Sequence, residues 1–407
     1  MHVFVSDLHM TDTGAGGAVT DGQLETFVNH LEKLAGERKD PIKLILLGDI
    51  FDLLRSPQWT ILWNEKKSAP WSAVSKNFKH FKNSPAEQTA IEVASKIASQ
   101  YPDFSASLCR LVQQKKIETL YIPGNHDFMM QLSPQLREIM VKFAALQHDV
   151  KKQFKLTYSD KEAEVYATHG NYHDPVNSHI AADGHWAMGD AVVLRIVNRF
   201  AEEACRALGC NLTQPIGLLL QEIDNIEPLS DIPLYVRWLV DENLVVKSSR
   251  DEVLKVWSDI VDDFLRLKDF REGGYKAKPY QMVRLGFELS KQMKLARLTT
   301  ELAKQFPDAG IDYREAARNE LGKNSAYRFV VFGHTHKPMM EPLTSAPEEQ
   351  VAFYVNTGCW RRLVTRPHGK SAGLFAGRRV ASYFVIDDST GNPAQERFHL
   401  LQEWHAS

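Results

Sequence analysis

The sequence predicts a layered α/β protein, in which short buried strands alternate with helices. Residues 3–5, 42–47 and 119–122 form apolar runs, and a continuous apolar run indicates a strand covered on both faces. Apolar residues recur at helical spacing over 20–34, and one or two further helices fit 87–116. Strands that alternate with helices in this order are typical of the α/β class.

The composition fits an ordinary folded protein and excludes a disordered chain. The 407 residues allow two or three domains, with 43% hydrophobic and 25% charged residues. The 49 Lys and Arg nearly balance the 51 Asp and Glu, which argues against a protein that coats nucleic acid nonspecifically. Four cysteines without CxxC spacing favour free thiols in a reducing compartment. We expect a cytoplasmic protein without a transmembrane segment, because no apolar run approaches the roughly 18 residues of a spanning helix.

Polar side chains follow each predicted strand directly. Three later strands, 164–167, 328–332 and 351–355, end in the same way, and strands 380–386 and 397–401 close the chain. In α/β sheets, ligands bind beyond the carboxyl ends of the strands, where these clusters stand. The candidate metal donors at these ends are aspartates, histidines and one asparagine, namely Asp7, His9, Asp49, Asn125, His169, His334 and His336.

This donor set indicates a metal centre. Oxygen and imidazole ligands without a thiolate suit Mn, Fe or Zn better than a structural zinc. In an extended segment, residues two apart point to one side, which would pair Asp7 with His9 and His334 with His336. A shared carboxylate such as Asp49 turns seven donors into two four-ligand sites, so we expect two divalent ions, with Mn favoured. Two metals about 3.5–4 Å apart can hold the attacking and leaving oxygens of a phosphoryl transfer, with metal-bound hydroxide as the nucleophile.

The five motifs resemble those of the calcineurin-like metallophosphoesterase superfamily. The family pattern of D-x-H, G-D-x-x-D, G-N-H-D/E, a lone H before G, and G-H-x-H stands, in that order, at residues 7–9, 48–52, 124–127, 169–170 and 333–336. The resemblance covers roughly residues 1–175 and 326–407. It implies a two-sheet β sandwich flanked by helices, with a dinuclear centre.

The resemblance also implies a role for each residue. His126 would be the acid that protonates the leaving oxygen, held in place by Asp127. Asp52 would contact a metal ligand without binding the metal itself, or would shape a turn. The ligands implied for the first metal are Asp7, His9, Asp49 and His336, and those for the second are Asp49, Asn125, His169 and His334.

Within the superfamily, the sequence is most similar to the bacterial UDP-2,3-diacylglucosamine hydrolases of lipid A synthesis. The shared stretches are Ser-Asp-Leu-His, Gly-Asp-Ile-Phe, Gly-Asn-His-Asp-Phe and Gly-His-Thr-His-Lys-Pro. Two features depart from that group. His126 stands where those hydrolases typically have Arg, and the helical insertion here is much longer.

The motifs divide the chain into a core and two insertions. The metallophosphoesterase core comprises residues 1–176 and 326–407, and the helix-rich segment 177–325 is spliced between two proposed ligands. We expect this segment to be a cap that selects the substrate and does no chemistry. The alternative is a helical layer that thickens the core or forms an oligomer. Residues 56–85 form a smaller insertion rich in Trp and Lys.

The leading functional prediction is a dinuclear phosphoesterase that cleaves a phosphomonoester, phosphodiester or pyrophosphate. Its substrate would be a phosphorylated small molecule, a nucleotide or a lipid-linked compound. A DNA or RNA nuclease is an alternative. The near-neutral net charge counts against it, and the one basic segment, at residues 66–67 and 76–82, is only modest. A non-catalytic scaffold is another, against which the full ligand set and His126 count. Four residues are candidates for substrate binding, although a polar loop or surface role also fits them: Asn171, His173, Arg361 and Arg362.

Overall fold

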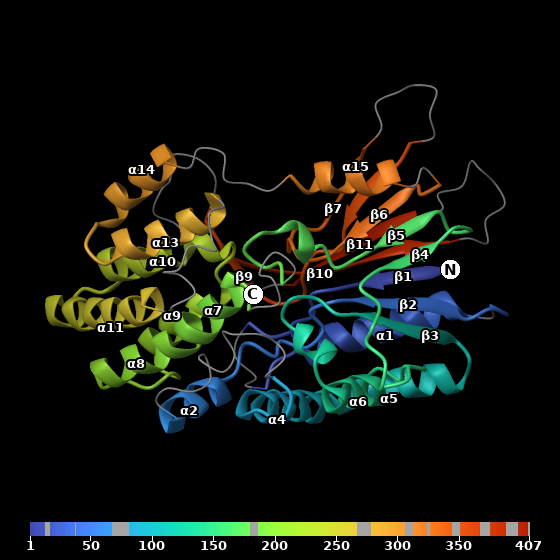
Figure 1. The fold of residues 1–407 in the computed structure, drawn as a ribbon, viewed down its shortest axis with the longest axis horizontal. Coiled ribbons are helices and arrows are strands. Elements are labelled where there is room, and N and C mark those ends of the chain that lie inside the picture. The colour runs from blue at the N-terminus through green and yellow to red at the C-terminus, as the bar shows by residue number, and fades with distance from the viewer. Residues whose placement is uncertain are drawn as a thin grey trace.

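Two β-sheets lie face to face, with helices outside them and a helical region to one side (Figure 1). The computed structural model describes residues 1–12, 17–36, 38–66, 81–179, 186–266, 278–305, 312–323, 326–343, 351–366, 375–387 and 398–405.

The first sheet has the order β11-β10-β1-β2-β3, and β9 pairs with β10. Strands β1, β2 and β3 are parallel, whereas β10 runs antiparallel to β1. The strand predicted at 42–47 has those bounds, while the one predicted from 119 begins two residues earlier. The strands are β1 (His2–Val5), β2 (Ile42–Leu47), β3 (Ile117–Ile122), β9 (Leu363–Thr365), β10 (Ala376–Ile386) and β11 (Phe398–His405).

The second sheet has the order β4-β5-β6-β8-β7, and its central strands β5, β6 and β8 are parallel. Its strands are β4 (Tyr158–Asp160), β5 (Val165–Ala167), β6 (Phe329–Phe332), β7 (Met339–Pro342) and β8 (Phe353–Asn356). Between the sheets lies a buried apolar layer to which both contribute, with Phe4, Leu47 and Phe384 from the first and Val331 and Val355 from the second. The predicted two-sheet sandwich flanked by helices is confirmed.

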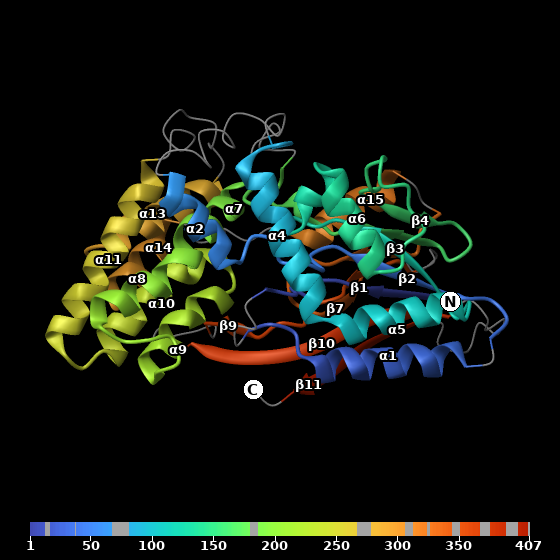
Figure 2. The same cartoon turned by 90° about the horizontal axis from the view of Figure 1, so that it is seen from below.

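Helices cover the outer faces of both sheets. Figure 2 shows α1 (Asp21–Ala35), α4 (Pro85–Gln100), α5 (Pro102–Gln113) and α6 (Pro134–Phe143) over the first sheet. Helix α1 begins at a capping box, in which Thr20 and Gln23 satisfy each other's backbone N–H groups. The second sheet is covered by α15 (Tyr313–Lys323), whose Ala317 lies in one apolar cluster with residues of β6 and β8.

The remaining helices of the insertion surround an apolar core of their own, which includes Phe200, Trp257, Phe264 and Phe287. The helical pattern over 281–306 divides into two helices. The elements are α7 (Met188–Val192), η4 (Val193–Val197), α8 (Asn198–Leu208), α9 (Pro215–Gln221), η5 (Glu222–Asn225), η6 (Leu229–Asp231), α10 (Ile232–Trp238), η7 (Leu239–Asn243), α11 (Lys247–Leu265), α13 (Lys278–Ser290) and α14 (Leu295–Gln305).

The boundaries of the insertions stay predictions. Helix α15 falls inside the predicted insertion yet packs on the core sheet. Of the smaller insertion, α2 (Pro57–Lys66) is helical, and 67–80 lies outside the described residues, as does most of the basic segment. Among the described helices, none is both long and apolar enough to cross a membrane.

Candidate metal centre

The loops that follow the parallel strands meet at one edge of the sandwich. Backbone hydrogen bonds join them. The N–H of Asp7 donates to the carbonyl of Gly48 at 3.0 Å, and that of His9 donates to Asp49 at 3.0 Å. The N–H of Gly333 donates to the carbonyl of His169 at 2.9 Å. Loops that are far apart in the sequence are therefore fixed to one another before any side chain is considered.

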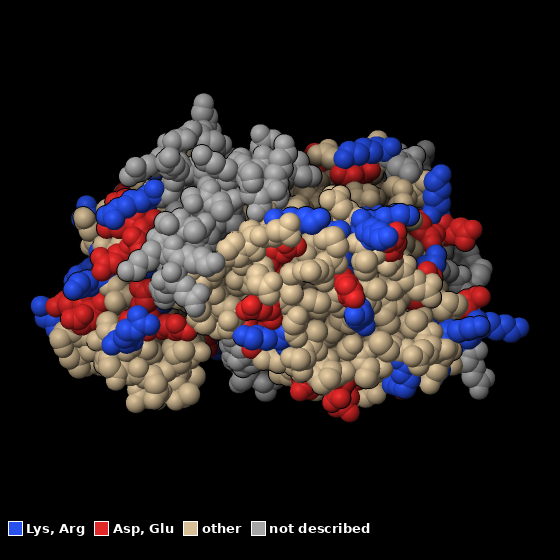
Figure 3. Space-filling model, turned by 60° about the horizontal axis from the view of Figure 1, so that its bottom comes forward, with Lys and Arg blue, Asp and Glu red and all other residues tan. Residues whose placement is uncertain are grey.

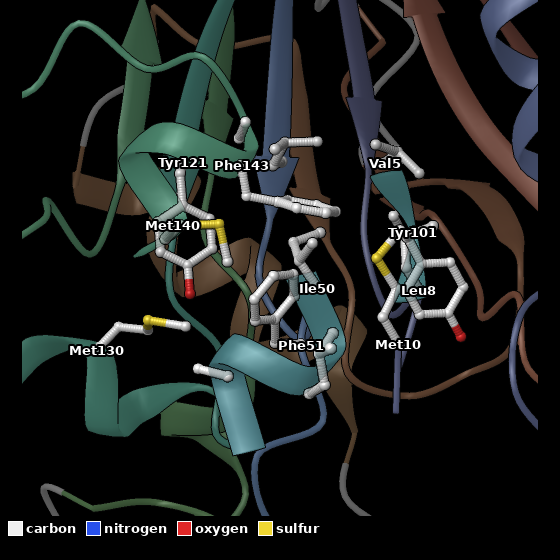
Figure 4. Close-up of a cluster of buried hydrophobic side chains, with 14 of the residues drawn as sticks. Val5, Leu8, Met10, Ile50, Phe51, Tyr101, Tyr121, Met130, Met140 and Phe143 are labelled. Carbon is white, nitrogen blue, oxygen red and sulfur yellow. The ribbon is translucent and has the colours of Figure 1, made fainter. Parts of the chain in front are cut away.

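Apolar residues between the proposed ligands anchor these loops in the core. Leu8, Met10, Ile50 and Phe51 are fully buried and lie in the cluster between the first sheet and its helices (Figure 4). The Phe51 ring meets that of Phe143 edge to face, with centroids 4.7 Å apart. The loops thus bury apolar side chains on one side and present polar ones on the other.

Five of the proposed ligands occupy the left-handed region of backbone conformation. Their φ angles are 51° at Asp7, 46° at His9, 52° at Asp49, 66° at His334 and 59° at His336. The expectation that Asp7 and His9 share one side of an extended segment is therefore wrong, as is the same argument for His334 and His336. Their side chains converge because tight turns redirect the chain at each strand end. Such conformations cost about 1–3 kcal/mol each and cluster at functional sites.

Two glycines allow the loops to approach this closely. A Cβ added at Gly124 would overlap the Asp49 carboxylate, and one added at Gly333 would overlap Ser6 and come 2.5 Å from Asp7 Oδ2. The glycines of the family pattern thus make room for the carboxylates.

The first group of donors is Asp7, His9, Asp49 and His336, all buried. His336 Nε2 lies 3.2 Å from Asp7 Oδ1, and His9 Nε2 lies 3.7 Å from the same oxygen. The two Nε2 atoms of His9 and His336 are 3.1 Å apart. His9 Nε2 is also 3.8 Å from Asp49 Oδ2, so two imidazoles and two carboxylates converge on one point.

The second group is Asp49, His169 and His334, also buried. His169 Nε2 lies 3.2 Å from Asp49 Oδ2 and 3.3 Å from Asn125 Oδ1. Asp49 belongs to both groups. The structure thus brings the seven candidate donors close together, and their grouping agrees with the two sets that the resemblance implies.

Each of the four histidines has an oxygen close to its other ring nitrogen, as a hydrogen-bond partner in three of them and as an ion-pair contact at His336. Such partners are usual for metal-binding histidines. The contacts are His9 Nδ1 to Asp52 Oδ2 at 2.9 Å, His169 Nδ1 to the Leu47 carbonyl at 2.8 Å, His334 Nε2 to Asp174 Oδ2 at 3.1 Å, and His336 Nδ1 to Glu227 Oε2 at 3.3 Å.

The carboxylates fit a bound cation. Asp49 Oδ1 accepts the N–H of His126 at 2.7 Å, and Asp7 Oδ2 accepts that of His334 at 3.0 Å. The second oxygens, Asp49 Oδ2 and Asp7 Oδ1, are buried without a hydrogen-bond partner and face the imidazoles. A buried oxygen left unpaired costs about 1–3 kcal/mol, and a divalent cation would satisfy both. The residues present therefore fit a divalent metal.

The electrostatics of the centre favour a cation as well. Burial alone would raise the pKa of Asp7, but His169, His336 and His9 hold it well below its usual range. The pKa of Asp49 is lowered in the same way, against burial, by His169 and His126. Burial would lower the pKa of His169, yet Asp49 and Asp7 raise it to about 9. The two carboxylates are thus ionised at neutral pH, and without a metal the proton on His169 balances part of their charge, a proton that a bound cation would displace.

His126 contacts a different carboxylate from the one predicted. His126 Nδ1 lies 2.8 Å from Asp52 Oδ1. Asp127 instead accepts the N–H groups of Gly124 at 2.6 Å and Ile50 at 2.9 Å, so it ties two loops together. Burial, and then the charge of Asp49, raise the pKa of Asp127 to about 7. The prediction that Asp127 holds His126 is corrected, because Asp52 lies in that position.

The candidate substrate residues lie in different surroundings. Arg361 is buried and donates from Nη2 to the Asp224 carbonyl at 2.8 Å, and Arg362 forms an ion pair with Glu222. Both arginines therefore contact the insertion. The buried Asn171 donates from Nδ2 to the Asn177 carbonyl, while His173 stacks on Phe332 with centroids 5.3 Å apart. Their binding of substrate stays a prediction.

Sequence reasoning missed three residues of this site. Arg55 Nη1 lies 2.8 Å from Asp52 Oδ2, and its Nε lies 2.7 Å from Asp224 Oδ1. Cys359 forms a further potential metal group with His9 and His336, and Glu227 approaches His336. Only Arg55 and Cys359 had a local signal, since both follow predicted strand ends.

Fold and site together define a layered α/β protein with a buried Asp/His centre suited to metal. The sequence model of the family described as calcineurin-like phosphoesterase matches residues 3–199. This match supports a calcineurin-like phosphoesterase domain over those residues and, with the Asp/His cluster, metal-dependent hydrolysis of phosphoesters. His334 and His336 lie beyond the matched segment. Among curated proteins, none matches the chain.

Proposed function

We propose that this protein is a dinuclear metal-dependent phosphoesterase, acting on a phosphomonoester, phosphodiester or pyrophosphate. Asp49 carries the proposal, because its single carboxylate belongs to both donor groups. Asp7, His9 and His336 would complete the first site, and Asn125, His169 and His334 the second. Divalent ions in such sites polarise phosphoryl oxygens and lower the pKa of water toward neutrality. Two ions with Mn favoured are part of the proposal.

His126 is the proposed general acid. Its Nδ1 contacts Asp52, which leaves Nε2 to carry the proton toward the leaving oxygen. The ring also meets that of His9 edge to face, with centroids 4.7 Å apart, so it stands beside the first donor group. Asp52 touches both rings, through Oδ1 to His126 and Oδ2 to His9. One carboxylate thus supports the proposed ligand and the proposed acid.

Replacement of His126 tests this role. His126→Ala should retain both metals and lose about 10²–10⁴-fold in kcat on a poor leaving group, as for other general acids. The loss should be smaller for p-nitrophenolate, which leaves without a proton. His148→Ala, at a partly exposed histidine, is the control. Equal losses on good and poor leaving groups would remove His126 from this role.

Metal analysis with a substrate panel tests the function as a whole. The panel comprises p-nitrophenyl phosphate, its bis ester, cyclic nucleotides, a UDP-linked lipid and DNA. Two metal equivalents with turnover of any small phosphoester or of the lipid pyrophosphate support the proposal. Metal-loaded protein without turnover contradicts it, and degradation of DNA favours a nuclease.

Two observations guide the choice of substrate. Basic and acidic side chains are interspersed on the face shown in Figure 3, and the near-neutral net charge of the whole sequence favours a small substrate over a nucleic acid backbone. The resemblance of the motifs to UDP-2,3-diacylglucosamine hydrolases makes a lipid-linked pyrophosphate one candidate. The cytoplasmic location and an oligomer formed through the helical insertion stay predictions.

A further inference from the structure

Residues 222–231 of the insertion, here named the docking segment, lie along the core segment 361–366. Arg362 forms an ion pair with Glu222, and Arg361 donates to the carbonyl of Asp224 at 2.8 Å. Arg361 also donates to Asn225 Oδ1 at 2.8 Å. Two neighbouring arginines of the core thus hold the docking segment at three positions, 222, 224 and 225.

Backbone and apolar contacts extend this attachment. Ile226 forms a parallel bridge with Val364, and the N–H of Glu227 donates to the Val364 carbonyl at 3.0 Å. Ile226 and Val364 are both buried in the apolar core of the insertion. The backbone of Glu227 therefore has a fixed position relative to the core.

From this position, the Glu227 side chain reaches the metal centre. Its Oε2 lies 3.3 Å from His336 Nδ1, while Nε2 of the same ring lies 3.2 Å from Asp7 Oδ1. The imidazole of His336 is thus placed between a carboxylate of the insertion and a carboxylate of the core. The side chain of Glu227 is 23% exposed, and that of His336 is 7% exposed.

We infer that Glu227 is a positioning residue of the metal centre, through which the helical insertion orients His336 toward the first metal. The inference rests on the proposed function, since it assigns His336 as a ligand. A carboxylate beside Nδ1 favours the tautomer with its proton on that nitrogen, which leaves the Nε2 lone pair for a cation. The insertion then takes part in building the centre besides covering it.

The other three histidines receive this support from the core. Their partners are Asp52, the Leu47 carbonyl and Asp174, all within residues 1–176. His336 is the one of the four whose partner comes from the insertion. Loss of Glu227 should therefore weaken the first site and leave the second intact.

The test is metal affinity, measured on the full chain by chelator competition with Mn²⁺. Glu227→Gln should weaken one of two equivalents by about 10–100-fold, the usual cost of losing such a partner. Glu227→Asp keeps the charge and should recover part of the affinity. Glu222→Gln is the matched control, since it removes another docking contact without approaching a proposed ligand.

The outcomes separate this inference from the proposed function. If the unaltered chain binds no Mn²⁺, the proposed function fails and the inference with it. If the unaltered chain binds two equivalents and Glu227→Gln binds both as tightly, the inference alone is overturned. An equal loss of affinity in Glu222→Gln would also overturn it, because docking in general would then be the cause.

Discussion

The strand-end loops of the core and the docking segment of the insertion both reach the metal centre, by different physical means. The core loops are placed by sheet register, by backbone hydrogen bonds and by apolar residues such as Ile50 and Phe51. The docking segment is placed by a short backbone bridge at Ile226 and, in addition, by side-chain charges, with Asp224 between two arginines. Ligand positions therefore follow from the fold of the core, whereas the contribution of the insertion also depends on individual ion pairs.

The largest effect of a single substitution is expected in the core loops, at Asp49, whose carboxylate is shared by both donor groups. Asp49→Ala should empty both sites and lower kcat by at least about 10³-fold, because the metals supply several kcal/mol to phosphoryl transfer. Metal content and turnover of p-nitrophenyl phosphate are the measurements. Asp103→Ala, at an exposed residue in the first turn of α5, is the control. Retention of two equivalents in Asp49→Ala would exclude a bridging role.

The sequence allowed the core and the donor set to be predicted for a clear reason. Each proposed ligand directly follows a strand, and parallel strands bring such ends to one edge. The local geometry could not be predicted in the same way. The positive φ angles of Asp7 and His9 arise from how the loops bond to one another across the sheet.

The residues that contact the proposed ligands and His126 from outside the two donor groups were harder to predict, because they are distant from them in the sequence. Asp127 is adjacent to His126, yet Asp52, from another strand end, makes the contact. Nothing near Glu227 or Asp224 marks either residue as part of a site. Arg361 was one candidate for substrate binding, and in the structure it donates hydrogen bonds to Asp224 and Asn225 of the insertion. Patterns along one strand reveal a ligand, whereas contacts between segments require the fold.

An intermediate effect is expected at Asp224, which joins the two regions. Its carboxylate lies 2.7 Å from Arg55 Nε and 3.3 Å from Arg361 Nη2, and both arginines are buried. Asp224→Asn should lower the free energy of unfolding by about 1–3 kcal/mol, since hydrogen bonds to charged groups contribute that much. Urea unfolding followed by tryptophan fluorescence measures it.

A matched change inside the insertion separates docking from general loss of charge. Asp263 pairs with Arg199 at 3.3 Å, and its side chain is 43% exposed. Asp263→Asn should cost less than about 1 kcal/mol, as exposed pairs usually do. Equal destabilisation by the two variants would mean that Asp224 has no special part in joining insertion to core.

A smaller effect than at Asp224 is expected within the core, at an ion pair that joins the two sheets. Asp160 of β4 lies 2.8 Å from Lys43 Nζ of β2 and 3.2 Å from His2 Nε2 of β1. Burial would raise the pKa of Asp160, but Lys43 holds it well below its usual value. A carboxyl whose pKa is lower in the folded state stabilises that state above its unfolded pKa, near 4, and loses the effect as the pH falls.

Asp160→Asn should therefore cost about 1 kcal/mol at pH 6, and the stability of this variant should approach that of the unaltered chain as the pH falls below about 4. Urea unfolding at pH 6, 5, 4 and 3 measures this, with Glu138→Gln in the exposed pair to Lys142 as the control. A difference that stays constant from pH 6 to pH 3 would show that the Asp160 charge does not stabilise the contact between the sheets.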